Sequence, residues 1–595
     1  MGKAIVFASP VFLLLIAIEL AWGVYKQRRG TGRNTYRLAD AVNSISLGML
    51  SQFTAVFTRL LRVGVYTFVY ASLSLVPLEA AKAFWNTWTG WFLALVFYDL
   101  CYYWLHRAGH EVAIFWAAHV VHHQSQDYNF STALRQTSSG ALLGWVFYIP
   151  MALAGVPPAV FGAVALVDLL YQFWVHTEHV GKLGWFDRWF CSPSNHRVHH
   201  AVNDAYLDKN YGGIWMVWDR LFGSFIEEDD ANRCVYGTRS PLQSWDPLWA
   251  NAEVYAALGK DVWHTRSWLD KLRVLVKPPG WRPADVAARF PKPAFSLNAA
   301  TAKFEAPAPR SAQWTSLVAF AILLQCVSAF LWFADSLGAG QQLVCVAALA
   351  AGVWTVGALL QGRLTISWAL MLWAAMLATL SSAMGWTLAH YIAKPSGMAI
   401  AIFIVATYVH MTRTTTLNTT KNSTDTSFSF APRLLLAALG FSLIGDVLLM
   451  FHGYFVFGLV AFLCAHLAYI ALFKRGVAWF PHRGALLATL VYGAAMYAFI
   501  YSYLPAALKL PVAVYVLAIA LMGAQALGRA SVRRDDASRC VAIGALFFMA
   551  SDTLLAINRF VTPLPVSALW VLSSYYTAQF LIARYALSTG AGGRS

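Results

Sequence analysis

Eight histidines fall into three closely spaced groups, which are His106-x-x-x-His110, His119-x-x-His122-His123 and His196-x-x-His199-His200. On a helix, residues three or four positions apart share one face, so each group can present its imidazoles together. Neutral imidazole is a common ligand of iron, zinc and copper. Eight imidazoles are more than one tetrahedral zinc ion uses. The pattern therefore predicts a histidine-rich centre with room for two metal ions.

The composition places these histidines in a membrane protein. Hydrophobic residues make up 58% of the 595-residue chain and charged residues only 12%, which is far from the balance of a soluble protein. The net charge of +16 requires no nucleic-acid partner, because the basic clusters lie at the ends of apolar runs, as the positive-inside rule expects. The seven cysteines are dispersed without a C-x-x-C pair, so no thiolate metal site is indicated. We expect an integral, multi-pass membrane protein that binds no nucleic acid.

Apolar runs long enough to span a bilayer occur along the whole chain. They lie at about 4–24, 84–104, 141–175 (a hairpin broken at Pro157-Pro158), 314–336, 340–360, 365–390, 398–412, 432–451, 454–473, 484–504, 511–528, 540–557 and 566–586. Residues 43–77 are ambiguous, because Arg59 and Arg62 interrupt that run. The first run lacks a convincing cleavage site, so we interpret it as a membrane anchor.

A polar segment divides the chain. Residues 177–313 are rich in charge and proline, and we interpret them as a cytosolic cap followed by a linker. Beyond them lie only spans and short loops, apart from a Thr/Ser/Asn-rich loop at 412–429. The sequence thus predicts an all-α polytopic membrane protein. Its expected parts are a histidine-bearing helical bundle with the cap at 1–310, a connecting transmembrane hairpin at 311–363 and an eight-helix transmembrane bundle at 364–590.

The positions of the histidines suggest how such a centre would work. The first group directly follows one apolar run, His176 and His179 follow the hairpin, and the third group lies in the cap. Metal ligands would therefore gather at the mouth of a helix bundle, which an apolar chain enters from the lipid while water and reductant arrive from the other side. A shell of histidines without thiolate suits two irons that activate O2, whereas Zn2+ has no redox capacity.

Several features between about residues 35 and 285 carry a family resemblance. They include the three histidine groups, Asp99 ahead of the first group, Asn195 directly before the third, FWVHTE at 173–178 and WDRLFG at 218–223. Together they resemble the fatty acid hydroxylase/sterol desaturase superfamily of membrane-bound, non-haem di-iron oxygenases. Within that superfamily they are similar to the alkylglycerol monooxygenase branch.

The resemblance implies a role for individual residues. Glu111 matches a glutamate beside the metal site of this branch and is a candidate catalytic residue. His179 is interpreted as a neighbour of the site. Asp99 and Asn210 are interpreted as groups that orient imidazoles through the second ring nitrogen. The implied metal ligands are His106, His110, His119, His122, His123, His176, His196, His199 and His200.

The resemblance also implies a reaction, namely the O2-dependent hydroxylation of a 1-O-alkylglycerol at its ether-linked carbon. The resulting hemiacetal would collapse to a fatty aldehyde and a glycerol. The implied cofactors are two iron ions, and the implied partners are a membrane lipid substrate, O2 and an external reductant. Tetrahydrobiopterin or another external electron donor would supply the electrons, and the histidine boxes would face the cytosol.

The second half of the chain places two carboxylates inside apolar runs, at Asp446 and Asp552 in the similar contexts GDVLL and SDTLL. A carboxylate at bilayer depth costs at least about 2.5–3.5 kcal/mol and marks a functional-site candidate. The alternative is a structural hydrogen-bond cluster that ties helices together. Other polar groups that could converge with the two aspartates are Lys394, His466, Tyr469, Tyr575, Tyr576 and Gln579.

These landmarks resemble the YhhN-type lysoplasmalogenase family over about residues 365–590. The family cleaves the vinyl ether of lysoplasmalogens by hydrolysis and releases a fatty aldehyde. The resemblance implies a catalytic pair in which one aspartate, kept protonated by apolar surroundings, donates a proton to the vinyl-ether carbon. The ionised aspartate would stabilise the oxocarbenium or activate water. The sequence leaves open which of Asp446 and Asp552 takes which role.

The sequence is also compatible with three other functions. One is a sterol or fatty-acyl hydroxylase or desaturase, since these chemistries share one ligand set. Another makes the C-terminal bundle a non-catalytic lipid-binding scaffold or a small transporter. The third is a zinc-loaded site that performs hydrolysis.

Overall fold

The computed structural model describes residues 2–419 and 430–585, and every regular element in these ranges is a helix. The predicted all-α class is therefore confirmed. The chain divides into two compact units, Met1–Ser336 with Gly352–Arg363 and Leu337–Ala351 with Leu364–Ser595. Helix α19 (Ala339–Leu360) thus contributes residues to both.

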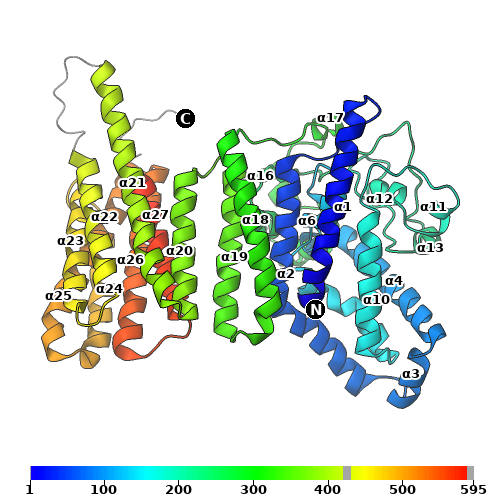
Figure 1. The fold of residues 1–595 in the computed structure, drawn as a ribbon, viewed down its shortest axis with the longest axis horizontal. Coiled ribbons are helices and arrows are strands. Elements are labelled where there is room, and N and C mark those ends of the chain that lie inside the picture. Colours follow the sequence, from blue (N-terminus) through cyan, green and yellow to red (C-terminus); the bar gives the residue numbers. More distant parts are fainter. Residues whose placement is uncertain (1, 420–429, 586–595) are drawn as a thin grey trace. The chain divides into compact units, whose positions relative to one another are not determined.

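The first unit combines long helices with many short ones (Figure 1). An apolar core that includes Tyr98, Met151 and Val164 lies between α2, α4, α9 and α10, and two of the short helices, α6 and α12, carry two histidines each. The elements are α1 (Gly2–Arg28), α2 (Leu38–Leu73), α3 (Leu78–Trp85), α4 (Trp88–Glu111), α5 (Ala113–Ala117), α6 (Val120–His123), α7 (Phe130–Ala133), α8 (Gly140–Leu143), the 3-10 helix η1 (Gly144–Tyr148), α9 (Ile149–Leu153), α10 (Pro158–Trp174), α11 (Phe186–Trp189), α12 (Pro193–His199), α13 (Val217–Leu221), α14 (Pro247–His264), α15 (Trp268–Val276), α16 (Ala284–Arg289), α17 (Leu297–Ala300) and α18 (Arg310–Phe333).

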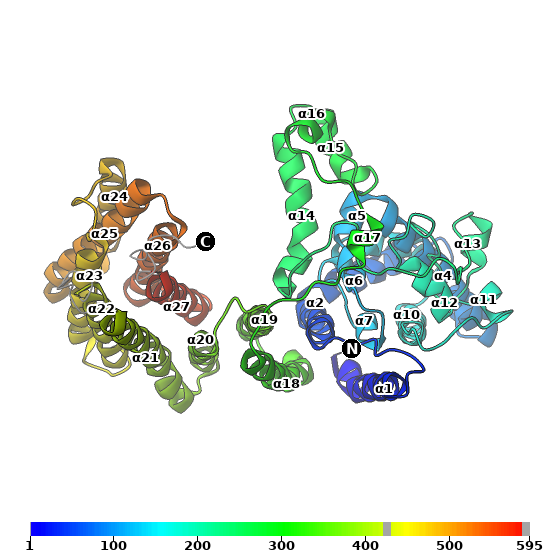
Figure 2. The ribbon, with the colours of Figure 1, turned by 90° about the horizontal axis from the view of Figure 1, so that it is seen from above.

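The second unit contains the predicted eight long helices. Consecutive helices pack in pairs, and α27 packs against both α26 and α20, which closes the bundle (Figure 2). Its apolar core includes Met398, Leu439, Phe548 and Ile582. The helices are α20 (Ile366–Met384), α21 (Thr387–Thr419), α22 (Phe430–Leu448), α23 (Phe455–Phe473), α24 (Arg483–Ile500), α25 (Ala506–Arg533), α26 (Asp536–Ala556), which continues into the π-helical turn η4 (Ile557–Val561), and α27 (Ser567–Tyr585).

Ten helices of the described residues are long and apolar enough to cross a membrane. They are α1, α18 with the turn after it, α19, α20, α21 up to Met411, and α22 to α26. The predicted spans at 84–104, 141–175 and 566–586 are not among them. Helix α4 carries Asp99 and Arg107 along with its histidines, α10 is 17 residues long, and α27 contains Gln579 and several hydroxyl side chains. The chain is a polytopic membrane protein.

Three segments differ from the sequence prediction. The first arm of the hairpin is divided into α8, η1 and α9, because Gly144 and Pro150 disfavour one continuous helix. The ambiguous stretch at 43–77 lies mostly within one helix of 36 residues, α2. The loop predicted from Thr412 begins later, since α21 continues to Thr419, and residues 420–429 lie outside the described part of the chain.

Candidate metal centre and carboxylate cavity

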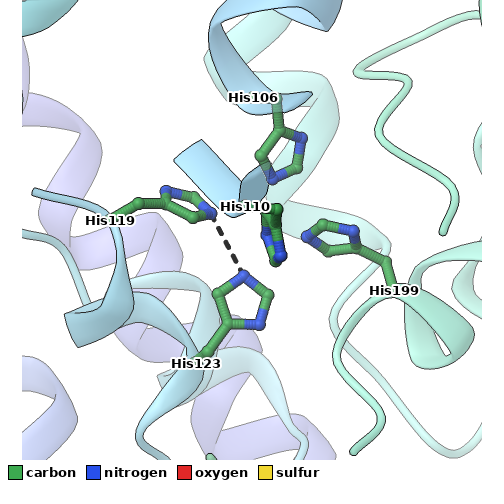
Figure 3. Close-up of side chains that lie close together, drawn as sticks. All are labelled: His106, His110, His119, His123 and His199. Atoms are coloured by element: carbon green, nitrogen blue, oxygen red, sulfur yellow. Dashed lines mark hydrogen bonds between the residues drawn. The ribbon is translucent and has the colours of Figure 1, made fainter. Parts of the chain in front are cut away.

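The fold brings all nine of the predicted metal-binding histidines together in the first unit. They form two groups, and within each group the candidate ligand atoms lie within 4.8 Å of one another. We name the five-histidine group centre A (Figure 3) and the four-histidine group centre B. Centre A consists of His106, His110, His119, His123 and His199, and centre B consists of His122, His176, His196 and His200.

The two centres do not coincide with the sequence groups. Helix α4 places His106 and His110 one turn apart on one face, so the first group stays together in centre A. Adjacent residues on a helix point about 100° apart, so the neighbours His122 and His123 on α6 enter different centres. The third group divides in the same way, because His199 belongs to centre A and the rest of the group to centre B.

Main-chain carbonyl oxygens hold four of these rings by their Nδ1 atoms. The Nδ1 atom of His106 lies 2.8 Å from the oxygen of Tyr211, and that of His199 lies 3.0 Å from the oxygen of Lys209. In centre B the corresponding partners are Arg135 for His122, at 2.9 Å, and Gln172 for His176, at 2.8 Å. A ring that donates its Nδ1 proton to a carbonyl leaves the Nε2 lone pair for a metal.

The expectation that Asp99 and Asn210 contact imidazoles is wrong. Asp99 accepts hydrogen bonds from the main-chain nitrogen of Ile214, at 2.7 Å, and the indole of Trp218, at 2.8 Å. The side chain of Asn210 bonds the main chain of Ile226 in both directions, and its own backbone has φ of 56°. Both residues shape the loop whose carbonyls hold His106 and His199, so their influence on the rings is indirect.

The histidine nitrogens fit a metal. The Nε2 atoms of His106, His110 and His199 are buried and have no hydrogen-bond partner, although buried polar atoms are normally paired unless they meet an ion or water. Burial lowers the pKa of His122 to about 4 and holds the pKa of His123 well below its usual value. These imidazoles are therefore neutral at neutral pH, which is the form that binds metal. A nitrogen-only donor set suits iron, zinc or copper.

Glu111 and His179 lie outside both centres. The carboxylate of Glu111 is half exposed and pairs with Arg107 at 2.9 Å. It also accepts a hydrogen bond from the hydroxyl of Tyr211 at 3.4 Å, and the ring of Tyr211 packs against three histidines of centre A, which are His106, His110 and His199. The hydroxyl of Tyr211 thus connects Glu111 to centre A, and His179 belongs to neither group of candidate ligands.

Two supporting residues were missed by the sequence reasoning. Glu19, within the anchor helix α1, is buried and bonds the side chain of Thr177 and the main-chain nitrogen of Phe130. It could have been found as the lone carboxylate of an apolar run. Arg135, whose carbonyl holds His122, is 1% exposed and donates to the carbonyl of Val121 at 2.8 Å. Nothing in the sequence around it distinguishes it from a surface arginine.

The second unit contains a largely apolar cavity of about 230 Å3 that both predicted aspartates line. Asp446 lies on α22 and Asp552 on α26, and the polar side chains that accompany them on the wall include Lys394, Tyr515 and Tyr575. The aspartates therefore converge, as the repeated sequence context suggested. Tyr469 and Gln579 instead bond each other at 2.7 Å.

The two aspartates have different partners. Asp446 is buried, lies 3.5 Å from the ammonium of Lys394 and accepts the hydroxyl proton of Tyr575. Asp552 accepts a hydrogen bond of 2.5 Å from Tyr515, whose hydroxyl lies 2.9 Å from Nε2 of His466. Tyr515 was not predicted, although a tyrosine inside an apolar run is the kind of signal that could have indicated it. One carboxylate thus faces a lysine and the other faces a tyrosine that is linked to a histidine.

The two halves of the chain are similar to different families of known proteins. Residues 91–224 match the family model described as fatty acid hydroxylase, and residues 389–586 match the YhhN family. The second half is similar to lysoplasmalogenase TMEM86A of Homo sapiens, with 34% identity over 160 residues, which is 26% of this chain and 65% of that protein. No solved structure gives a significant match.

The first half is similar to alkylglycerol monooxygenases. The Danio rerio protein is 38% identical over 276 residues, which is 46% of this chain and 59% of that protein. The Homo sapiens protein is 35% identical over 318 residues, which is 53% of this chain and 68% of that protein. With its two histidine centres and the matched region around them, the chain belongs to the alkylglycerol monooxygenase family, and it carries a YhhN region in its second half.

Proposed function

We propose that the first unit is a membrane-bound di-iron monooxygenase that cleaves 1-O-alkylglycerol ether lipids to a fatty aldehyde and a glycerol. The observation that carries the proposal is the pair of buried all-histidine centres in a chain related to alkylglycerol monooxygenases. One iron would bind to the histidines of centre A and one to those of centre B. The bound irons would supply O2 activation, which zinc cannot do.

The balance of this reaction requires a reductant. One oxygen atom of O2 enters the carbon–hydrogen bond beside the ether oxygen, and the other leaves as water after accepting two electrons and two protons. The hemiacetal product then loses the glycerol alcohol and becomes the aldehyde. We propose that tetrahydrobiopterin or another external donor supplies the electrons. We also propose that the histidines face the cytosol and that the donor reaches them from that side.

The residues of the chain do the remaining work. The carbonyls of Tyr211, Lys209, Arg135 and Gln172 hold four rings in one tautomer, which keeps their Nε2 lone pairs directed at the centres. We propose that Glu111 acts as a positioning residue, which holds the Tyr211 ring against the histidines of centre A.

We propose that the second unit hydrolyses the vinyl ether of lysoplasmalogens. The support is the cavity that Asp446 and Asp552 share, together with the likeness to lysoplasmalogenase TMEM86A. The side chain of Asp552 is 18% exposed and accepts a hydrogen bond from the hydroxyl of Tyr515, and we propose it as the proton donor. Lys394 favours the charged form of Asp446.

These partners suggest a role for each aspartate. Asp552 would donate its proton to the vinyl carbon that is not bonded to oxygen, and the positive charge would form on the ether-linked carbon. Asp446 would accept a proton from the water that attacks that carbon. The hemiacetal then collapses to an aldehyde and a free alcohol, and the proton returns to Asp552 through water. One water molecule is consumed and no electrons are transferred.

Aldehyde release from the purified full chain tests both proposals. One reaction contains a 1-O-alkylglycerol with iron and a reduced pterin, with and without O2, and the other contains a lysoplasmalogen under the same two atmospheres. We expect the alkylglycerol to release aldehyde only with O2 and the lysoplasmalogen to release it in both atmospheres. Aldehyde from the alkylglycerol without O2 would contradict the oxygenase, and an intact lysoplasmalogen would contradict the hydrolase.

A further inference from the structure

Helix α14 exposes apolar residues where a surface helix in water carries charged ones. Its exposed positions recur every three or four residues and include Trp249, Ala252, Ala256 and Trp263, with one cation, Lys260, among them. Trp263 is 82% exposed. The face toward the protein, in contrast, contains the buried Asp261, which pairs with Arg282 at 2.8 Å. This pattern is the reverse of an amphipathic helix that packs its apolar face on a core.

Helix α15 repeats the pattern directly afterwards. Its exposed residues include Trp268, Leu269, Leu272 and Val276, and Trp268 is 82% exposed. Two consecutive helices of the cap therefore form one continuous run of exposed aromatic and aliphatic side chains. An exposed apolar patch of this kind marks a surface that a membrane or another protein covers.

The direction of α14 indicates that a membrane covers it. The candidate span α18 and helix α10 are seen end-on in Figure 2, whereas α14 is seen along its length, so it runs across the direction of the spans. Its first residues are held by the last turns of another candidate span, because Trp354 of α19 donates a 3.0 Å hydrogen bond to Asp246, the N-cap of α14. A helix that starts at the end of a span and runs across it lies at the level of the membrane surface.

The charges around the patch favour lipid over another protein. Arg266 and Lys277 are exposed beside the apolar residues, whereas two of the nearby acidic residues are paired, Asp261 with Arg282 and Asp270 with Arg273. Exposed cations next to aromatic residues are typical of segments that lie at an anionic lipid surface.

We propose that α14 and α15 form a lipid-contacting platform, which lies in the headgroup region of the membrane and buries its exposed tryptophans among the lipids. The platform adjoins the metal site through α5, which packs against both helices and lies between His110 and His119 of centre A. The main-chain nitrogen of Ala113 on α5 also donates a 3.0 Å hydrogen bond to the carbonyl of Lys277. The platform thus keeps the lipid surface beside the metal centre.

Labelling of the full chain in lipid nanodiscs, with one copy per disc, tests this proposal. Cysteine is introduced at Leu272 in one variant and at Asp230, whose side chain is 90% exposed, in the other. Both variants react with a charged maleimide, and the labelling of the native cysteines in the wild-type chain is subtracted. We expect the cysteine at 272 to react at least about tenfold more slowly than that at 230. Equal rates would overturn the proposal, and complete labelling of both after denaturation controls for reactivity.

A second measurement needs no introduced cysteine. Wild-type chain and the W263F/W268F variant are placed in nanodiscs with and without brominated phospholipids, and the difference between their emission reports the two tryptophans. We expect brominated lipids to remove most of that difference signal. An unchanged difference signal would show that water or protein covers the patch, and would overturn the proposal whatever substrate the enzyme uses.

Discussion

The two candidate sites of this chain are built in opposite ways. In the first unit, nine imidazoles form the centres, and main-chain carbonyls hold four of them. In the second unit, the candidate reactive groups are two carboxylates, and side chains from other helices hold each of them. The first design depends on loop geometry, and the second depends on individual side chains.

This difference has a consequence for mutational sensitivity. A carbonyl partner remains after most substitutions, so centres A and B should withstand changes in surrounding side chains and fail only when a ligand is lost. The aspartates lose a partner when Lys394, Tyr575 or Tyr515 is replaced, and an unpaired buried charge or donor is costly. We therefore expect substitutions around the metal centres to have either a very large or a very small effect on activity. Substitutions around the aspartates should give a graded series of effects.

Replacing one imidazole should produce the largest effect. We expect His199→Ala to reduce bound iron and to lower aldehyde release from a 1-O-alkylglycerol by at least about a thousandfold, because a centre that lacks a ligand does not hold its metal for redox chemistry. Hydrolysis of a lysoplasmalogen should remain unchanged. Metal analysis and the aldehyde assay measure both quantities on one preparation.

The matched control is His179→Ala, since His179 lies near the site but in neither centre. It should retain iron and activity. If the two variants behave alike, the division of the histidines into ligands and neighbours is wrong.

The aspartates come next in the size of the effect. We expect Asp552→Asn and Asp446→Asn to lower lysoplasmalogen hydrolysis by about 10²–10⁴-fold, as is usual for the loss of a general acid or base, and to leave alkylglycerol cleavage unaffected. Asp536→Asn, on the same helix as Asp552 but exposed, serves as the control. Full activity of both cavity variants would favour a lipid-binding or scaffolding bundle.

A smaller effect should follow from the partner of Asp552. Tyr515→Phe removes one hydrogen bond to the carboxylate without changing the shape of the cavity, and we expect about a tenfold lower hydrolysis rate, equivalent to about 1.4 kcal/mol. The pH profile of kcat should change as well if Tyr515 takes part in proton transfer. A lower rate with an unchanged pH profile would indicate a purely structural role for Tyr515.

The sequence was sufficient to predict features of the candidate sites that depend on residue type. It did not predict features that depend on how the chain folds in three dimensions. Imidazole spacing indicated eight of the nine histidines, the family resemblance added His176, and two carboxylates in apolar runs indicated the aspartates. The division of His122 and His123 between two centres was not predictable, because it follows from how α6 lies between other helices. The carbonyl partners were also hidden, since every residue has a carbonyl and only the fold selects that of Arg135 or Tyr211.

The same reason explains the errors in the fold. A hydropathy pattern sees apolar residues but not the breaks that Gly144 and Pro150 introduce, so three short helices were predicted as one arm of a hairpin. A hydropathy pattern also averages the apolar residues of α14 and α15 into the polar cap around them, so it does not indicate their exposure. Their exposed positions become significant once the direction of the helices is known.

Replacing Glu111 should have the smallest effect, and it tests most strictly whether the metal centres depend on loop carbonyls rather than on charged side chains. Its carboxylate pairs with Arg107 and reaches centre A only through a 3.4 Å contact with the hydroxyl of Tyr211. We therefore expect Glu111→Gln to lower alkylglycerol cleavage by about threefold or less, since one weak hydrogen bond is lost and every imidazole keeps its carbonyl partner. Bound iron should be unchanged, and Tyr211→Phe should give the same small loss. A hundredfold loss in Glu111→Gln with normal iron would instead mean that this carboxylate touches the reacting atoms, and that the centre relies on a charged side chain as the aspartate cavity does.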